Sequence, residues 1–192
     1  IYGEAVMSNF LRRYQENTRL LNTLKIVADI AIIIVAAYVI ILFTCYRTNI
    51  SGNSMQPVLC NNDTVLINKF AYAYLSPKRY DVIAFKTSDS GFDKIYIKRV
   101  IGVPGDKVLI KDGKVYINDK QLEDDVFTDN ILTAGLAKNE LYLNKGEYFC
   151  LGDNRNNSED SRFANIGIIK RENIVGAPWL ITSPFNRFGR VK

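Results

Sequence analysis

The feature that most constrains the fold is a long apolar run, LKIVADIAIIIVAAYVIILFTC, over residues 24–45. About 20 consecutive apolar residues form a helix of about 30 Å, which matches the hydrocarbon core of a bilayer. Only Lys25 and Asp29 interrupt the run, both near its beginning. A cleaved signal peptide would have a shorter apolar region followed by small residues, and a buried core helix would be shorter or striped. The run therefore predicts a transmembrane anchor.

Positive charge is distributed unequally around this run. Arg12, Arg13, Arg19 and Lys25 lie before it or at its start, whereas only Arg47 follows it closely. Segments rich in Lys and Arg stay on the cytoplasmic side of a membrane. We therefore expect a cytoplasmic N-terminus and a domain outside the cytoplasm after the anchor.

The chain is accordingly expected to have three parts. These are a cytoplasmic tail over residues 1–23, the anchor over residues 24–45 and an extracytoplasmic domain over residues 46–192. Residues 106–148 are richer in charged and turn residues than their surroundings, which predicts a small, exposed insertion subdomain.

Composition excludes several classes of function. The net charge of +5 comes without a dense basic segment, so no nucleic-acid partner is implied. The chain has no histidine, and its three cysteines match no metal-ligand spacing, so no metal site is expected. A disulfide between Cys60 and Cys150 is one alternative outside the cytoplasm, and free buried thiols are the other.

The part after the anchor has the pattern of a mainly β domain. Short runs rich in β-branched and aromatic residues alternate with turn residues. The Asp-Gly pair in KDGK, residues 111–114, lies between VLI and VYI and predicts a hairpin with a type I′ turn. These runs are DTVLINKF, DVIAFK, KIYIKRVIGV, KVLIKDGKVYIND, EYFCLG and NIVGAPWLI.

Ser54, in the turn segment SGNSMQPVL, is the candidate nucleophile. A serine hydroxyl needs a base to accept its proton, and the absence of histidine excludes the usual triad. A lysine can replace histidine only if an apolar environment lowers its pKa from about 10.4. Lys98 suits this role best because Tyr96, Ile97 and Val100 surround it in sequence.

Four segments in this order resemble the conserved motifs of type I signal peptidases. They are SGNSMQPVL, YDVIAFK, KRVIGVPGD and GDNRNNSEDSR, and the ending SPFNRFGRV is similar to that of Gram-positive members. The resemblance implies a signal-peptidase-type β fold, with Ser54 as nucleophile and Lys98 as general base. The implied activity is that of a membrane-bound serine endopeptidase. It would remove signal peptides from secreted preproteins after small residues, of the Ala-x-Ala type, through an acyl-enzyme and without a cofactor.

The resemblance also implies roles for residues around this dyad. Ser158 would orient the amine of Lys98. Asp160 and Arg162, with Arg99, would form an ion-pair cluster that braces the site. Gly52 stands where Gram-negative members have a serine that helps to bind the oxyanion. The oxyanion hole is therefore expected to rely on the backbone around Gly52 and Ser54, together with another donor.

The substrate is expected to bind extended beside an exposed strand, with alternate side chains in apolar pockets. The residues that match pocket positions in the family are Ile50, Met55, Leu59, Tyr96 and Ile97. The aromatic residues in FAYAYL, residues 70–75, and near Trp179 are expected either to contact lipid headgroups or to pack in the core. Two alternatives are a specialised relative from conjugative transfer or an organellar inner membrane, and an inactive anchored binding module.

Overall fold

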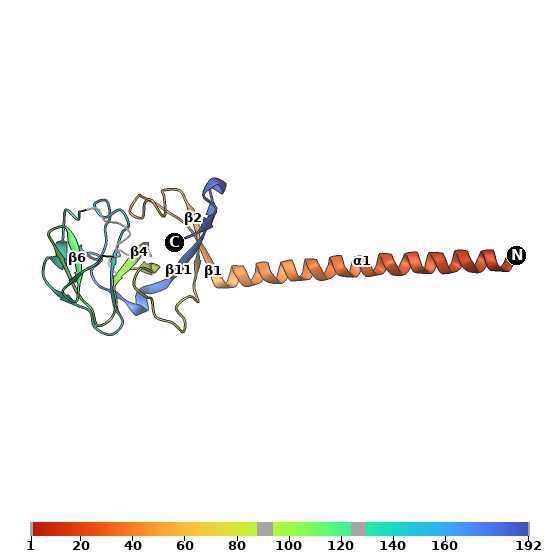
Figure 1. Ribbon diagram of the computed structural model, residues 1–192, viewed down its shortest axis with the longest axis horizontal. Helices are drawn as coiled ribbons and strands as arrows, with labels where there is room; N and C mark the ends of the chain where they lie inside the picture. Colours follow the sequence, from red (N-terminus) through yellow and green to blue (C-terminus); the bar gives the residue numbers. More distant parts are fainter. Residues whose placement is uncertain (1, 88–93, 124–129, 192) are drawn as a thin grey trace. The chain divides into compact units, whose positions relative to one another are not determined.

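The computed structural model describes residues 2–87, 94–123 and 130–191, and its contacts divide the chain into two units, residues 1–43 and 44–192. The described part of the first unit is helix α1 (Tyr2–Thr44) without its last residue, shown in Figure 1. Its segment Thr18–Ile41 has a mean hydropathy of 2.6 and is long and apolar enough to cross a membrane. No part of this segment is buried against other described residues, unlike the core helix of a soluble protein. The structure thus contains the helix that the sequence predicts.

The ends of this helix differ from the predicted anchor. Residues 2–23, predicted only as a tail, continue the helix toward the N-terminus. Cys45, predicted to end the anchor, instead begins strand β1, because its backbone pairs with that of Asn68 in β2.

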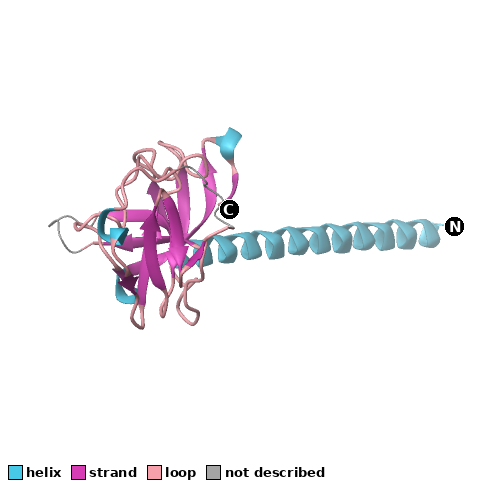
Figure 2. Ribbon diagram, turned by 60° about the vertical axis from the view of Figure 1, so that its left-hand side comes forward, coloured by secondary structure: helices cyan, strands magenta, loops and turns pink. Residues whose placement is uncertain are grey.

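The second unit is mainly β, as predicted, and its described strands form two antiparallel sheets (Figure 2). The larger sheet contains the paired neighbours β11, β3 and β4 at its centre. Its strands in spatial order are β1 (Cys45–Asn49), β2 (Thr64–Asn68), β11 (Ile174–Ser183), β3 (Val82–Lys86), β4 (Ile95–Gly102), β9 (Glu147–Leu151) and β10 (Ile169–Lys170), with β12 (Gly189–Arg190) paired to β11.

The smaller sheet lies within the stretch predicted as an insertion, of which residues 124–129 are outside the described residues. Figure 1 marks this sheet by β6, to the left of β4. At its hairpin Lys111 pairs with Lys114, and Asp112 and Gly113 have φ values of 51° and 73°. Both lie in the region that a type I′ turn requires, which confirms the predicted hairpin. The strands are β7 (Lys120–Gln121), β6 (Lys114–Ile117), β5 (Lys107–Lys111) and β8 (Leu141–Tyr142).

Short 3-10 helices connect some of these strands. They are η1 (Gly135–Lys138), η2 (Arg171–Asn173) and η3 (Phe185–Arg187).

Strand β4 contributes to three buried apolar clusters. Ile97 belongs to a cluster with Met55 and Leu59, which precede β2. Val100 belongs to a second cluster around β3 and β9, and Ile101 to a third that joins β4 and β9 to the smaller sheet. A polar side chain in the middle of β4 is therefore surrounded by core.

The three cysteines are free, and no disulfide joins Cys60 to Cys150. Cys150 lies on β9 and is fully buried, and burial raises the pKa of its thiol. Cys60 is half-buried in the segment before β2. Of the two alternatives that the sequence allows, the structure has free thiols.

Candidate active site

Ser54 lies in a closed loop between β1 and β2, which we call the nucleophile loop (residues 50–63). At its neck the amide of Ile50 donates to the carbonyl oxygen of Asp63 at 2.8 Å. Met55 and Leu59 anchor the loop in the core, and the amide of Leu59 donates to the carbonyl oxygen of Met55 at 2.8 Å. Burial of these two side chains holds the adjacent Ser54 half-exposed at the surface.

The backbone before Ser54 contains the one glycine that the loop geometry requires. Gly52 has a φ of +93°, a conformation that residues with a side chain rarely adopt. Its amide donates to the side-chain oxygen of Asn61 at 2.9 Å, so that amide is engaged within the loop. Between described residues, no hydrogen bond uses the amide of Ser54. The Ser54 amide is therefore a backbone donor that is open to a ligand.

Lys98, from the middle of β4, points its amine at this serine. The distance from Lys98 Nζ to Ser54 Oγ is 2.7 Å, and Lys98 is only 4% exposed. Burial lowers the pKa of Lys98 to about 8, although the charges of Asp160 and Glu159 partly oppose the effect of burial. At a pKa of about 8, about a tenth of the Lys98 amines are neutral at pH 7, compared with about four in ten thousand for an ordinary lysine.

Ser158 lies beside the nucleophile loop but does not hold Lys98. Its hydroxyl is buried and has no hydrogen-bond partner among the described residues. It packs against Gly152, where a Cβ atom would collide with the Ser158 hydroxyl and lie 2.5 Å from the carbonyl oxygen of Ser54. The hydrogen bond to Lys98 that the family resemblance implies is therefore not formed in this structure.

Two buried ion pairs lie next to the contact between Gly152 and Ser158. Arg162 donates to both carboxylate oxygens of Asp160, at 2.8 and 2.9 Å, and the amide of Gly152 donates to Asp160 at 3.0 Å. Arg99 donates to both oxygens of Asp153, at 2.7 and 2.8 Å. The pairing of Asp160 with Arg162 agrees with expectation. Arg99, however, pairs with Asp153, which the sequence analysis did not single out.

Asn154 is a second residue that sequence reasoning missed. Its amide donates to the carbonyl oxygen of Ser54 at 3.1 Å, and its side chain donates to the carbonyl oxygen of Asn53 at 3.2 Å. These bonds join the segment after β9 to the nucleophile loop. Asn154 lies in GDNRNNSEDSR, one of the four segments that resemble the family motifs. Nothing in the sequence, however, indicates which polar residue of that segment faces Ser54.

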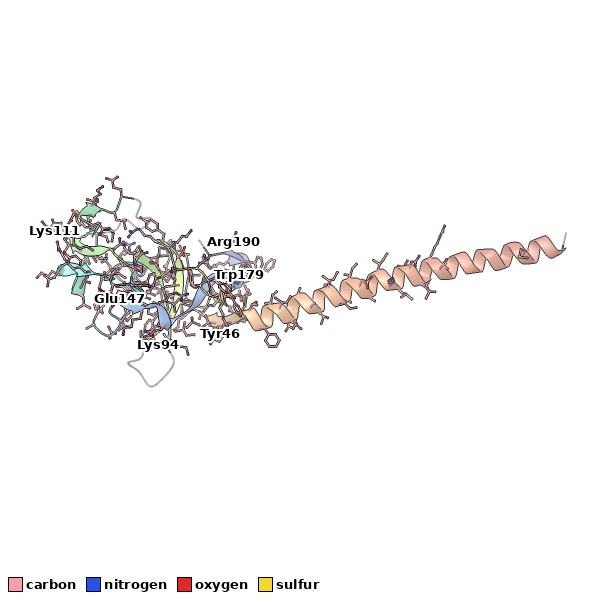
Figure 3. The ribbon with its side chains drawn as sticks, turned by 90° about the horizontal axis from the view of Figure 1, so that it is seen from below. Tyr46, Lys94, Lys111, Glu147, Trp179 and Arg190 are labelled. Atoms are coloured by element: carbon pink, nitrogen blue, oxygen red, sulfur yellow. The ribbon has the colours of Figure 1, made fainter. Side chains whose placement is uncertain are left out.

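A cleft of about 390 Å³ opens beside the serine and the lysine. Its walls are residues 48–55 and 94–98, with Asn157 and Glu159 at one side. Figure 3 labels Lys94, the lining residue that immediately precedes β4. Four of the five predicted pocket residues line the cleft: Ile50, Met55, Tyr96 and Ile97. The fifth, Leu59, does not line it, because its side chain is fully buried in the core beneath the loop.

One edge of β4 is open at this cleft. Residues 95–99 pair with β3 on one side, whereas β9 pairs on the other side only with Arg99, Val100 and Gly102. Among the described residues, no strand therefore covers the second edge of residues 95–98. Unpaired strand edges accept an extended peptide through main-chain hydrogen bonds.

Known proteins that are similar to this chain are signal peptidases. The family model described as "Signal peptidase, peptidase S26" matches residues 23–182, from α1 into β11. The chain is 31% identical to signal peptidase I U of Bacillus subtilis over 177 residues, which cover 88% of this chain and 93% of that protein. It is 33% identical to signal peptidase I of Leptolyngbya laminosa over 172 residues, which cover 86% and 82% of the two chains. A crystal structure of a signal peptidase I from Enterococcus faecalis is 32% identical, covers 53% of this chain and 96% of its own, and has a TM-score of 0.44.

Proposed function

The chain belongs to the signal peptidase family, peptidase S26, and from that premise we propose that it removes N-terminal signal peptides from secretory preproteins by a Ser54–Lys98 mechanism. As a member of this family it is a serine peptidase, and it has one helix suited to cross a membrane. The observation that carries the proposal is the 2.7 Å contact between Ser54 Oγ and the amine of the buried Lys98. A neutral amine at this distance can accept the proton of the hydroxyl directly.

In the first half of the reaction Ser54 is acylated. Ser54 Oγ attacks the carbonyl carbon of the scissile peptide bond, and its proton passes to Lys98 Nζ. The negative charge that develops on the carbonyl oxygen is stabilised by the open amide of Ser54. The ammonium of Lys98 then gives its proton to the leaving nitrogen as the carbon–nitrogen bond breaks. The signal peptide remains attached to Ser54 as an ester.

In the second half water releases the signal peptide. The neutral Lys98 amine takes a proton from a water molecule, whose oxygen attacks the ester carbon. The carbon–oxygen bond to Ser54 breaks, and the proton returns from Lys98 to Ser54 Oγ. The same amine therefore serves both steps, and no cofactor is involved.

The cleft supports binding of an extended peptide with small side chains before the cut. The open edge of β4 at residues 95–98 can pair with the peptide backbone. Alternate side chains would then meet Ile50, Met55 and Ile97. Met55 and Ile97 are buried in the core cluster, so they have little room to move aside for a large side chain. This packing favours residues such as alanine at the pocket positions.

We assign the bracing of the dyad to the Asp160–Arg162 and Arg99–Asp153 pairs. Both pairs are buried and bidentate, which fixes the orientation of the segment that packs on Ser54. Ser158 contributes by packing against Gly152, which also lies against the carbonyl oxygen of Ser54.

The anchor supports a location at the membrane surface. Ser54 follows Cys45 by nine residues, so even an extended chain spans at most about 30 Å between them. The excess of basic residues before the span favours a cytoplasmic N-terminus, with the catalytic domain outside. A preprotein held in the same membrane by its own apolar segment would present its cleavage point at that surface.

The dyad is tested by Ser54→Ala and Lys98→Ala in the full chain, in detergent, with a precursor that has Ala-x-Ala before the cut. Both variants should bind the precursor and lower kcat by about a thousandfold or more, because each removes a group needed for acylation. Cleavage is followed by mass spectrometry of the released N-terminus. Ser76→Ala and Lys111→Ala, which change exposed residues of the same types, serve as controls.

Two outcomes would contradict the proposal. Substantial cleavage by either dyad variant would remove the mechanism. A wild-type chain that binds the precursor but leaves it intact would favour an anchored binding module.

A further inference from the structure

The C-terminal segment SPFNRFGRV places an arginine against the nucleophile loop. Arg187, at the end of η3, donates from Nε to the two carboxylate oxygens of Asp63, at 2.9 and 3.1 Å. Its Nη2 donates to Asp63 Oδ2 at 3.0 Å and to the carbonyl oxygen of Val58 at 3.1 Å. Arg187 and Asp63 are 124 residues apart in sequence. The end of the chain thus contacts the loop that carries Ser54.

Asp63 closes the nucleophile loop at its neck. Its carbonyl oxygen accepts from Ile50, and its carboxylate accepts from the amide of Cys60 at 2.8 Å. The amide of Asp63 in turn donates to the carbonyl oxygen of Cys60 at 3.1 Å. The Asp63 side chain is only 1% exposed. Arg187 binds both this carboxylate and the carbonyl oxygen of Val58. It therefore fixes the part of the loop around Val58 relative to the neck at Asp63.

The segment that carries Arg187 is itself held in place. β12 pairs with β11, with Leu180 opposite Arg190, and the amide of Val191 donates to the carbonyl oxygen of Trp179 at 3.1 Å. Figure 3 shows Trp179 and Arg190 close together at this end of the sheet. The guanidinium of Arg187 therefore extends from a hydrogen-bonded hairpin rather than from a loose tail.

We propose that Arg187 is a positioning residue, which holds the nucleophile loop so that Ser54 stays within reach of Lys98. The inference rests on the proposed function and assigns to the C-terminal segment a part in that same site. Arg187 is 32% exposed but Asp63 is buried, so removing Arg187 leaves a buried carboxylate without this partner and should also lower stability. Misplacement of a reacting group by about 1 Å can cost about a hundredfold in rate. The rate of cleavage by folded protein is therefore the readout of the positioning role.

The test is Arg187→Ala in the full chain, compared with Arg190→Ala. Arg187→Ala should lower kcat by about ten- to a hundredfold and change KM by less than about threefold, because the cleft walls remain. The pH at which kcat is half-maximal should not change, because Arg187 does not contact Lys98. Arg190 is exposed and lies on the same hairpin, so its replacement removes the same charge and should keep the wild-type kcat.

Further variants distinguish positioning of Ser54 from a role in stability alone. Each is measured well below its own melting temperature. Arg187→Lys keeps the charge but loses the fork of donors, so its kcat should lie between those of wild type and Arg187→Ala. Combining Arg187→Ala with Asp63→Asn should lower kcat by less than the product of the two single effects, because both break one contact. This comparison identifies the pair as the route of the effect.

The inference is overturned if Arg187→Ala has the kcat of Arg190→Ala, or if the two single effects multiply. If Arg187→Ala does not fold, a wild-type kcat for Arg187→Lys overturns it instead. Failure of the proposed function looks different, because the wild-type chain would then not cleave the precursor, and the inference would fall with it.

Discussion

At the scale of single residues, the proposed mechanism depends on where Lys98 is placed. Its position in β4 puts it beside all three apolar clusters, and burial lowers the pKa of its amine to about 8. The charges of Asp160 and Glu159 act in the opposite direction and keep the amine basic. A general base works best when its pKa is close to the working pH, because it must be both neutral and able to accept a proton. The surroundings of Lys98 meet both conditions.

Ser54 depends on a different balance. As the proposed nucleophile it must reach a peptide, and it lies half-exposed in a loop. Its oxygen must also stay at hydrogen-bond distance from a buried amine. Anchoring of the neighbouring Met55 in the core resolves the conflict. The backbone that carries the hydroxyl is therefore held in place although the hydroxyl lies at the surface.

At the scale of elements, the site is formed where the nucleophile loop, β4 and the segment after β9 meet. Gly152 lies where the segment after β9 comes closest to the nucleophile loop, because its hydrogen atom faces Ser158 and the carbonyl oxygen of Ser54. The backbone amide of Asn154, two residues further on, donates to that same carbonyl oxygen. A substitution that disturbs this contact would therefore displace Ser54 without replacing either residue of the dyad.

Gly152→Ala tests this contact. The new methyl group would force the segment and the loop apart, so we expect a loss of about 1–3 kcal/mol in unfolding free energy and a fall in kcat of about tenfold or more. Gly189→Ala is the matched control, since a Cβ there meets nothing within 4 Å, and it should be close to neutral. The measurements are chemical denaturation and precursor cleavage. A Gly152→Ala variant as stable and as active as Gly189→Ala would contradict the packing.

The sequence predicted what depends on local chemistry. The Asp112–Gly113 turn follows from conformational preference. A serine without histidine needs a buried lysine as its base, and the resemblance to the signal peptidase motifs identified Ser54 and Lys98 as that pair. The partner of Arg99 was not predictable in this way. Asp153 and Asp160 stand in one polar segment, and their choice of partner is decided by how that segment folds back on β4.

Other features depended on tertiary contacts in the same way. Leu59 has the apolar character of a pocket residue, but the loop turns it into the core. The hydroxyl of Ser158 faces Gly152, and no sequence pattern fixes that rotamer. The contact of Arg187 with Asp63 joins residues far apart in sequence, and only the fold brings them together.

At the scale of the whole molecule, the described residues form an apolar helix and a β domain. The helix has no described contacts that bury its apolar segment, so it requires lipid or another apolar environment. Several large apolar side chains of the β domain are also exposed, and contact of residues 70–75 and Trp179 with lipid stays a prediction. They include Phe70, Tyr74, Leu75, Trp179, Phe185 and Phe188.

The orientation of the chain is a prediction at this scale. In a bacterial host, an epitope tag at the C-terminus should be digested by protease added to spheroplasts, because the basic residues keep the other end inside. A tag at the N-terminus should be digested only after the membrane is opened. The reverse pattern would place the β domain in the cytoplasm and contradict the proposed role.

The most direct test of the account is the dependence of kcat on pH at saturating precursor, with the full chain in detergent. Because Lys98 is active only when neutral, kcat should rise with pH, reach half its maximum near pH 8 and then level off. A half-maximum near pH 10.5, or a kcat that does not change between pH 6 and about pH 10, would show that Ser54 is not activated by a buried lysine.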